Sequence, residues 1–140
     1  HELELRIESL TNLGQGIARD NGWVIQVPFV IPGEVILARI YRNHKNYSEA
    51  DCIDIQSPSP DRIIPKCDLF GTCGGCQYQH IDYAAQLRWK HRQISELFRR
   101  VGGFDPAVVQ PVIACPNPYH YRNRVDRNRL EDGRSYLRRI

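Results

Sequence analysis

Three cysteines near the middle of the chain restrict its fold more than any other feature. Cys67, Cys73 and Cys76 form a Cys-x5-Cys-x2-Cys run that contains two adjacent glycines, Gly74 and Gly75. Two thiolates three positions apart can bind one metal centre, and glycines let the backbone turn tightly around it. Thiolate-bound centres in proteins usually have four ligands, and this run supplies three of them. The sequence therefore predicts a metal-bound loop whose fourth ligand lies elsewhere.

The spacing alone leaves the identity of the metal open. An iron–sulfur cluster fits three thiolates, and so does a zinc ion whose tetrahedron is completed by His80 or Cys115. A loop of free thiols without any metal is the third alternative. A metal bound here would be structural, because the loop has too few apolar residues to fold around a core of its own.

Residues 1–57 carry the pattern of short strands separated by turns. Apolar and charged residues alternate at the start, and the predicted strands cover 2–8, 17–19, 23–28, 34–41 and 50–55. Five short strands with regular turn signals predict a small, closed five-stranded β-barrel. Its expected interior consists of the following residues or their neighbours: Ile7, Val24, Val27, Val35, Leu37 and Ile53.

Beyond the barrel, the chain has one clear helix. Residues 58–81 are predicted to form a linker and the cysteine loop, and 82–140 a helix and the start of a basic α+β region. Asp82 is a favourable N-cap, and Gly102-Gly103 would end the helix. Apolar side chains at helical spacing form one stripe, which comprises Leu87, Ile94, Leu97, Phe98 and Val101. The fold class is therefore mainly β with α.

Charge is distributed unevenly along the chain. Residues 1–66 contain 7 Lys and Arg against 9 Asp and Glu, whereas residues 67–140 contain 12 against 7. A basic half favours a polyanionic partner such as nucleic acid, although a solvated charged surface produces the same counts.

Several classes of protein are disfavoured. The chain has five cysteines and no secretory leader, which argues against a disulfide scaffold and favours a reducing, cytoplasmic location. The most apolar stretch, 23–41, is interrupted by proline, glycine and glutamate and is not expected to span a membrane. Because the chain begins at His1 and contains no Met, we expect it to be part of a longer protein.

Two polar segments are candidates for nucleic-acid contacts. Loops of small β-barrels bind single strands through aromatic stacking and phosphate contacts, and the loop before the last strand predicts such contacts from Arg42, Lys45, Asn46 and Tyr47. Arg122 and Arg124 would face the same side of a strand and could clamp a phosphate or splayed bases. The alternatives are an exposed polar hairpin and an ordinary charged strand face.

Four motifs occur in an order that resembles the N-terminal part of the RNA uracil-5-methyltransferase family. They are Gly-Gln-Gly-Ile-Ala (14–18), Val-Pro-Phe-Val-Ile-Pro-Gly-Glu (27–34), the cysteine run followed by Gln79 and His80, and Tyr-Arg-Asn-Arg (121–124). Members of that family use S-adenosylmethionine to make 5-methyluridine in ribosomal or transfer RNA. The resemblance implies that 1–57 form a TRAM domain, an OB-like module that binds RNA.

The same resemblance implies a [4Fe-4S] cluster held by Cys67, Cys73 and Cys76, with a fourth cysteine further downstream. Gln79 and His80 would support the cluster loop. Cys115 precedes the Tyr-Arg-Asn-Arg motif and does not match the fourth ligand, nor is it expected to be a nucleophile.

The implied function is the RNA-binding and iron–sulfur portion of an S-adenosylmethionine-dependent RNA (uracil-C5)-methyltransferase acting on 23S rRNA. The domain for S-adenosylmethionine, the cysteine nucleophile and the acidic proton acceptor would lie outside 1–140, so no catalytic residue is assigned and this chain alone is expected to be inactive. The alternative is a non-catalytic RNA-binding module with a zinc- or iron-stapled loop. A radical methylthiotransferase ranks last, because its Cys-x3-Cys-x2-Cys motif precedes its barrel.

Overall fold

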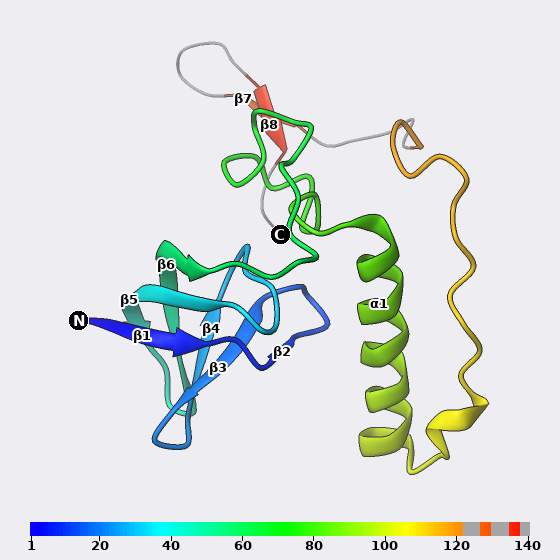
Figure 1. Cartoon of the computed structure of the whole chain (residues 1–140), viewed down its shortest axis with the longest axis horizontal. Coiled ribbons are helices and arrows are strands. Elements are labelled where there is room, and N and C mark those ends of the chain that lie inside the picture. Colours follow the sequence, from blue (N-terminus) through cyan, green and yellow to red (C-terminus); the bar gives the residue numbers. More distant parts are fainter. Residues whose placement is uncertain (122–126, 130–134, 138–140) are drawn as a thin grey trace.

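The computed structural model describes residues 1–121, 127–129 and 135–137, which form a sheet, one long helix and a separate hairpin (Figure 1). Arg122 and Arg124 lie outside the described residues. The elements are β1 (Glu2–Arg6), β2 (Ser9–Leu10), β3 (Gly16–Asp20), β4 (Trp23–Val27), β5 (Val35–Asn43), β6 (Tyr47–Ser57), α1 (Tyr83–Leu97), a π-helical turn (Phe98–Gly102), a 3-10 turn (Pro106–Val108), β7 (Arg127–Arg129) and β8 (Ser135–Leu137).

Six strands form the sheet, in the order β1-β5-β6-β4-β3-β2. The two edge strands are consecutive in the chain and are separated only by Ile7 and Glu8, so the sheet must curl until its edges meet. The amide of Glu8 donates to the carbonyl of Ile17 at 2.8 Å, whereas β1 and β2 share no ladder among the described residues. The prediction of a mainly β fold with α is confirmed.

The predicted small, closed five-stranded barrel differs from the structure in two details, since the sheet has six strands and no ladder joins its two edges among the described residues. The first predicted strand bends after Arg6 into two short strands that pair with different partners, β5 and β3. Ile7 and Glu8 connect the two edge strands along the chain, and the sheet is not closed by hydrogen bonds between those strands among the described residues. All neighbouring strands are antiparallel except β4 and β6, which pair in parallel through Val24 and Tyr47.

Some predicted core residues are buried, whereas at other positions the buried residue is the neighbour of the predicted one. Its buried members are Leu5, Ile7, Ala18, Ile25, Val27, Val30, Ile36, Ala38 and Ala50. Ile7 and Val27 were predicted correctly, but Val24, Val35 and Leu37 are only half-buried and Ile53 is 43% exposed. On β5 both faces are apolar, so alternation could not decide between them, and a one-residue shift exchanges the faces.

The helix α1 begins where the sequence predicts. The carboxylate of Asp82 accepts a hydrogen bond from the amide of Ala84 at 3.1 Å, and Gly103 ends the π-helical turn with a left-handed φ of 66°. The predicted apolar stripe is mainly on the surface, since four of its five members are at least 40% exposed: Ile94, Leu97, Phe98 and Val101. Helical spacing therefore predicted the helix but not the packing of this face.

The first half of α1 packs against the sheet through a second, smaller core, which comprises Leu10, Ile31, Ile81 and Ala85. The side-chain Nε2 of Gln93 reinforces this contact by donating to the carbonyl of Thr11 at 2.6 Å and to the hydroxyl of Tyr78 at 3.0 Å. The helix and the end of the cysteine loop are thus fixed to the same side of the sheet (Figure 1). None of the helices in the described ranges is long and apolar enough to cross a membrane.

Candidate nucleic-acid interface and cysteine loop

A buried carboxylate joins the sheet to the segment that leads into the cysteine loop. Glu34, in the turn before β5, is completely buried. Its Oε1 accepts from Nε of Arg62 at 2.6 Å, and its Oε2 accepts from Nη2 of the same guanidinium at 2.8 Å. Such a two-pronged pair fixes both the distance and the orientation of its partners.

Backbone amides complete the surroundings of this carboxylate. Those of Ile31 and Ser59 donate to it at 2.8 and 3.1 Å, and Nη2 of Arg62 also donates to the carbonyl of Phe29 at 2.9 Å. Burial acts to raise the pKa of Glu34, but the hydrogen bonds from Arg62 and the two amides outweigh it, so the pKa is lowered. Residues 59–62, which read as a linker, are therefore held rigidly against the sheet.

A buried histidine lies beneath the cysteine loop. His80 is 1% exposed, and its ring packs against Phe70 and Phe29 with centroid separations of 5.4 and 6.3 Å. Its Nδ1 has no hydrogen-bond partner among the residues that the structure describes. Burial, assisted by the charge of Arg62, lowers the pKa of His80 to about 4, so the ring is neutral at physiological pH. His80 thus supports the loop as an uncharged core residue.

The three loop cysteines lie close in sequence but do not converge on one point. Cys73 is half-buried, and its sulfur accepts from the amide of Gly75 at 3.4 Å; Cys67 and Cys76 are exposed. Gln79 supports the loop as expected, because its Oε1 accepts from the amide of Cys67 at 3.2 Å. Within the described part of the chain, no three His, Cys, Asp or Glu side chains are arranged to hold a metal ion.

The predicted nucleic-acid loop is at the tip of the hairpin formed by β5 and β6. Arg42, Lys45 and Asn46 are exposed, and the rings of His44 and Tyr47 stack with centroids 4.3 Å apart. In Figure 1 this tip and the β3–β4 tip lie at the end of the sheet away from the cysteine loop. The structure therefore gathers the predicted loop contacts but separates them from the cysteines.

Sequence reasoning missed an aromatic residue beside this hairpin tip. Trp23 is 43% exposed and opens β4, whose next residue pairs with Tyr47. Its indole Nε1 donates to the hydroxyl of Ser48 at 2.8 Å, and that hydroxyl donates to the side-chain oxygen of Asn43 at 2.7 Å. The sequence does show a tryptophan directly after the Asn21-Gly22 turn. Its position beside the hairpin tip depends on the parallel pairing of β4 with β6, which the sequence does not indicate.

Comparison with known protein families identifies the type of domain that the sheet forms. The family model described as the TRAM domain matches residues 1–53, nearly the whole six-stranded unit. Residues 1–53 are a TRAM domain. The predicted TRAM type of domain is thereby confirmed, and the exposed hairpin tip belongs to it.

Relatives extend the likeness beyond the TRAM domain. A protein named as an uncharacterised RNA methyltransferase of Chlorobaculum tepidum is 44% identical over 95 residues, 68% of this chain and 20% of its own. One of the same designation from Halalkalibacterium halodurans is 37% identical over 122 residues, 87% of this chain and 27% of its own. The predicted resemblance to RNA methyltransferases is confirmed, and the chain spans about a quarter of the length of these curated relatives.

A solved structure also resembles the chain. It is the Pyrococcus abyssi tRNA (uracil-54, C5)-methyltransferase in complex with S-adenosyl-L-homocysteine, with a TM-score of 0.45 and 28% identity. The match covers 72% of this chain and 22% of that protein.

Replacing Glu34 by Gln should destabilise the fold strongly. The substitution leaves the partly buried guanidinium of Arg62, whose side chain is 21% exposed, without its counter-charge, and breaking a buried pair costs about 3–5 kcal/mol. Urea denaturation measures the loss. The matched control is Glu8→Gln, which removes a half-exposed pair with Arg19 and should cost less than about 1 kcal/mol. Equal, small losses in both variants would contradict the structural role of the buried pair.

The buried histidine predicts a loss of stability in mild acid. Unfolded His80 takes up a proton near its ordinary pKa of 6.5, whereas the folded form resists it down to about 4, so protonation favours unfolding between these values. The contribution of neutral His80 to the free energy of unfolding is fully present above pH 6.5. Below this pH the free energy of unfolding should fall by up to about 1.4 kcal/mol per pH unit. His80→Phe keeps the ring packing and should flatten this slope between pH 6.5 and 5, before Glu34 protonates. An unchanged slope in denaturation curves would refute the assignment.

Proposed function

We propose that the chain is the RNA-binding and iron–sulfur portion of an S-adenosylmethionine-dependent RNA (uracil-C5)-methyltransferase that acts on 23S rRNA. The observation that carries the proposal is a TRAM domain with an exposed basic and aromatic hairpin tip, fixed by a buried ion pair to a three-cysteine loop. The likeness to proteins named RNA methyltransferases supports it.

RNA would be held first at the hairpin tip. Lys45 and Arg42 supply exposed positive charge for phosphates, and the stacked pair of His44 and Tyr47 supplies an aromatic surface for bases. Trp23 would add a second aromatic group on the neighbouring strand. Arg122 and Arg124, outside the described residues, remain proposed contacts from the basic half of the chain.

The cysteine loop would hold a [4Fe-4S] cluster through Cys67, Cys73 and Cys76. The donor set fits, because thiolates are the usual ligands of such clusters and the amide of Gly75 already donates to the sulfur of Cys73. Two of the thiols are exposed and can reach an incoming cluster. Since metal sites commonly form as their ligands fold around the metal, gathering the thiols would accompany binding. The cluster would be a structural staple, with the fourth ligand outside this chain.

Methyl transfer itself would be carried out by another part of the full-length protein. Its relatives are about four to five times as long as the segment matched here, which leaves room for a domain that binds S-adenosylmethionine. That domain would supply the nucleophile and the proton acceptor, whereas the chain described here binds and orients the RNA. Residues 1–140 alone would then bind RNA without methylating it.

We expect the full-length protein, given S-adenosylmethionine, to form 5-methyluridine in 23S rRNA. Because Arg42 and Lys45 would bind RNA equally in the ground and transition states, replacing both by Ala should raise KM and leave kcat unchanged. Lys90→Ala removes a positive charge from α1 and is the control. Nucleoside analysis measures the product. If 5-methyluridine forms only in transfer RNA, the proposed target, 23S rRNA, is wrong. If 5-methyluridine forms in neither RNA, the result favours a non-catalytic RNA-binding module.

The full-length protein purified without oxygen should contain about four irons and four sulfides per chain. Replacing Cys67, Cys73 and Cys76 together by Ser should abolish both, because three thiolates would be lost. Cys115→Ser, which removes an exposed thiol outside the loop, should leave the iron content unchanged. One zinc per chain without sulfide would overturn the cluster assignment.

A further inference from the structure

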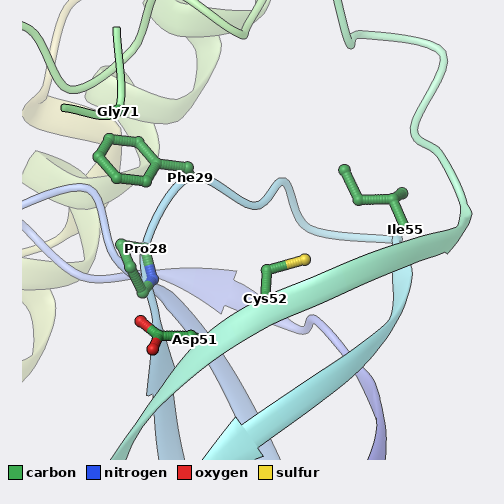
Figure 2. Close-up of a pocket in the computed structure, with 6 residues that line it drawn as sticks. All are labelled: Pro28, Phe29, Asp51, Cys52, Ile55 and Gly71. Carbon is green, nitrogen blue, oxygen red and sulfur yellow. The ribbon is translucent and has the colours of Figure 1, made fainter.

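A pocket of about 400 Å³ lies between the TRAM domain and the cysteine loop (Figure 2). Three segments form its walls: the turn after β4, the middle of β6 and the cysteine loop. The lining residues are Pro28, Phe29, Asp51, Cys52, Ile55 and Gly71. None of them belongs to the hairpin tip or to the proposed cluster ligands, so the function proposed above leaves this pocket unexplained.

The aromatic wall of the pocket is held in a strained conformation. Phe29 has a φ of 62°, in the left-handed region that bulky side chains rarely adopt. Its carbonyl accepts from Arg62, and its ring meets that of Phe70 edge-on, with centroids 5.1 Å apart. Backbone strain of this kind persists only where surrounding contacts impose it, and it concentrates at binding sites. The fold thus imposes the position of this ring at the pocket.

The polar group of the pocket is a carboxylate. Asp51 is exposed on β6, and Figure 2 shows its carboxylate turned toward Pro28, while the sulfur of Cys52 points the other way, toward Ile55. Although Arg39 is the residue opposite Asp51 on β5, the Asp51 carboxylate has no hydrogen-bond or ion-pair partner among the described residues. Burial raises the pKa of Cys52, so its thiol remains uncharged. The pocket therefore offers one side-chain carboxylate beside the apolar side chains of Pro28, Phe29 and Ile55.

We propose that this pocket binds one unstacked base of the RNA and that it prefers guanine. The inference rests on the RNA-binding function proposed above. Apolar walls shield the faces of a splayed base from water, and a carboxylate selects base edges that carry hydrogen-bond donors. Guanine presents two adjacent donors, N1–H and N2–H, which match the two oxygens of Asp51.

The other bases match the carboxylate less well. Uracil has one N–H between two carbonyl oxygens, which a carboxylate repels. Adenine and cytosine each present an amino group next to a ring nitrogen that is itself an acceptor. One of the two carboxylate oxygens would then face an acceptor, so only guanine satisfies both.

The pocket also lies where RNA held at the hairpin tip would reach it. The strand β6 begins at Tyr47 in the tip and reaches the pocket at Asp51. Four residues of extended strand span roughly 13 Å. A single RNA strand of a few nucleotides could therefore contact the tip and place one base in the pocket.

The test uses the full-length protein and two labelled nine-nucleotide RNAs, one of uridines only and one with a single central guanosine. Fluorescence anisotropy gives both affinities. The guanosine RNA should bind at least about fivefold more tightly, the lower limit expected of a two-pronged base contact. Asp51→Asn places an amide donor against a base donor. The ratio of the affinity for the guanosine RNA to the affinity for the uridine RNA should therefore fall close to one. Because Asp51 is exposed, the variant should keep its melting temperature.

Two controls separate the possible failures. Asp54→Asn removes another exposed carboxylate of β6 that does not line the pocket, and it should leave the ratio unchanged. The Arg42→Ala, Lys45→Ala double variant should lower the affinity for both RNAs by the same factor. A ratio near one in the wild type, or one that Asp51→Asn does not change, overturns the guanine pocket while RNA binding stands. If neither RNA binds, the RNA-binding function fails and the pocket proposal fails with it.

Discussion

The buried pair of Glu34 and Arg62 determines how the two halves of the described chain are joined. Taking the Glu34 carboxylate out of water, together with most of the Arg62 side chain, is costly, and the pair is tolerated because four hydrogen bonds reach the carboxylate. The geometry is therefore demanding, and few arrangements of residues 59–62 against the TRAM domain could satisfy it. A segment rich in proline and serine, which would otherwise be a mobile linker, is held in one orientation.

Three features of the candidate site follow from this pair. The guanidinium of Arg62 binds the carbonyl of Phe29 and thereby helps to hold its strained backbone at the pocket. Its positive charge also disfavours protonation of His80, which keeps a neutral ring beneath the cysteine loop. Finally, the loop starts only a few residues after Arg62, so its first part begins from a fixed point. One buried interaction thus orders the pocket, the histidine and the loop.

Local signals in the sequence predicted the elements that depend on local physics. The cap at Asp82, the left-handed Gly103 and the exposed hairpin tip all follow from neighbouring residues. Contacts between distant residues could not be predicted in this way: Glu34 and Arg62 are 28 positions apart, and no periodic pattern links them. The apolar faces of β5 were ambiguous for the same reason, since only packing decides that Ile36 rather than Val35 is buried. Cysteine spacing predicts the type of ligand, but not the positions of the thiols.

The strand β6 connects the hairpin tip, where we propose that RNA binds, with the pocket beside the cysteine loop. The strand starts at the hairpin tip, passes the pocket at Asp51 and ends at Ser57, just before the segment anchored by Glu34. Gly71 of the cysteine loop forms part of the pocket wall. Any interaction that orders the cysteine loop, including a bound cluster, therefore also shapes the pocket. In the proposed function, a cluster bound at the cysteine loop would in this way affect the RNA-binding pocket, although it would lie far from the hairpin tip.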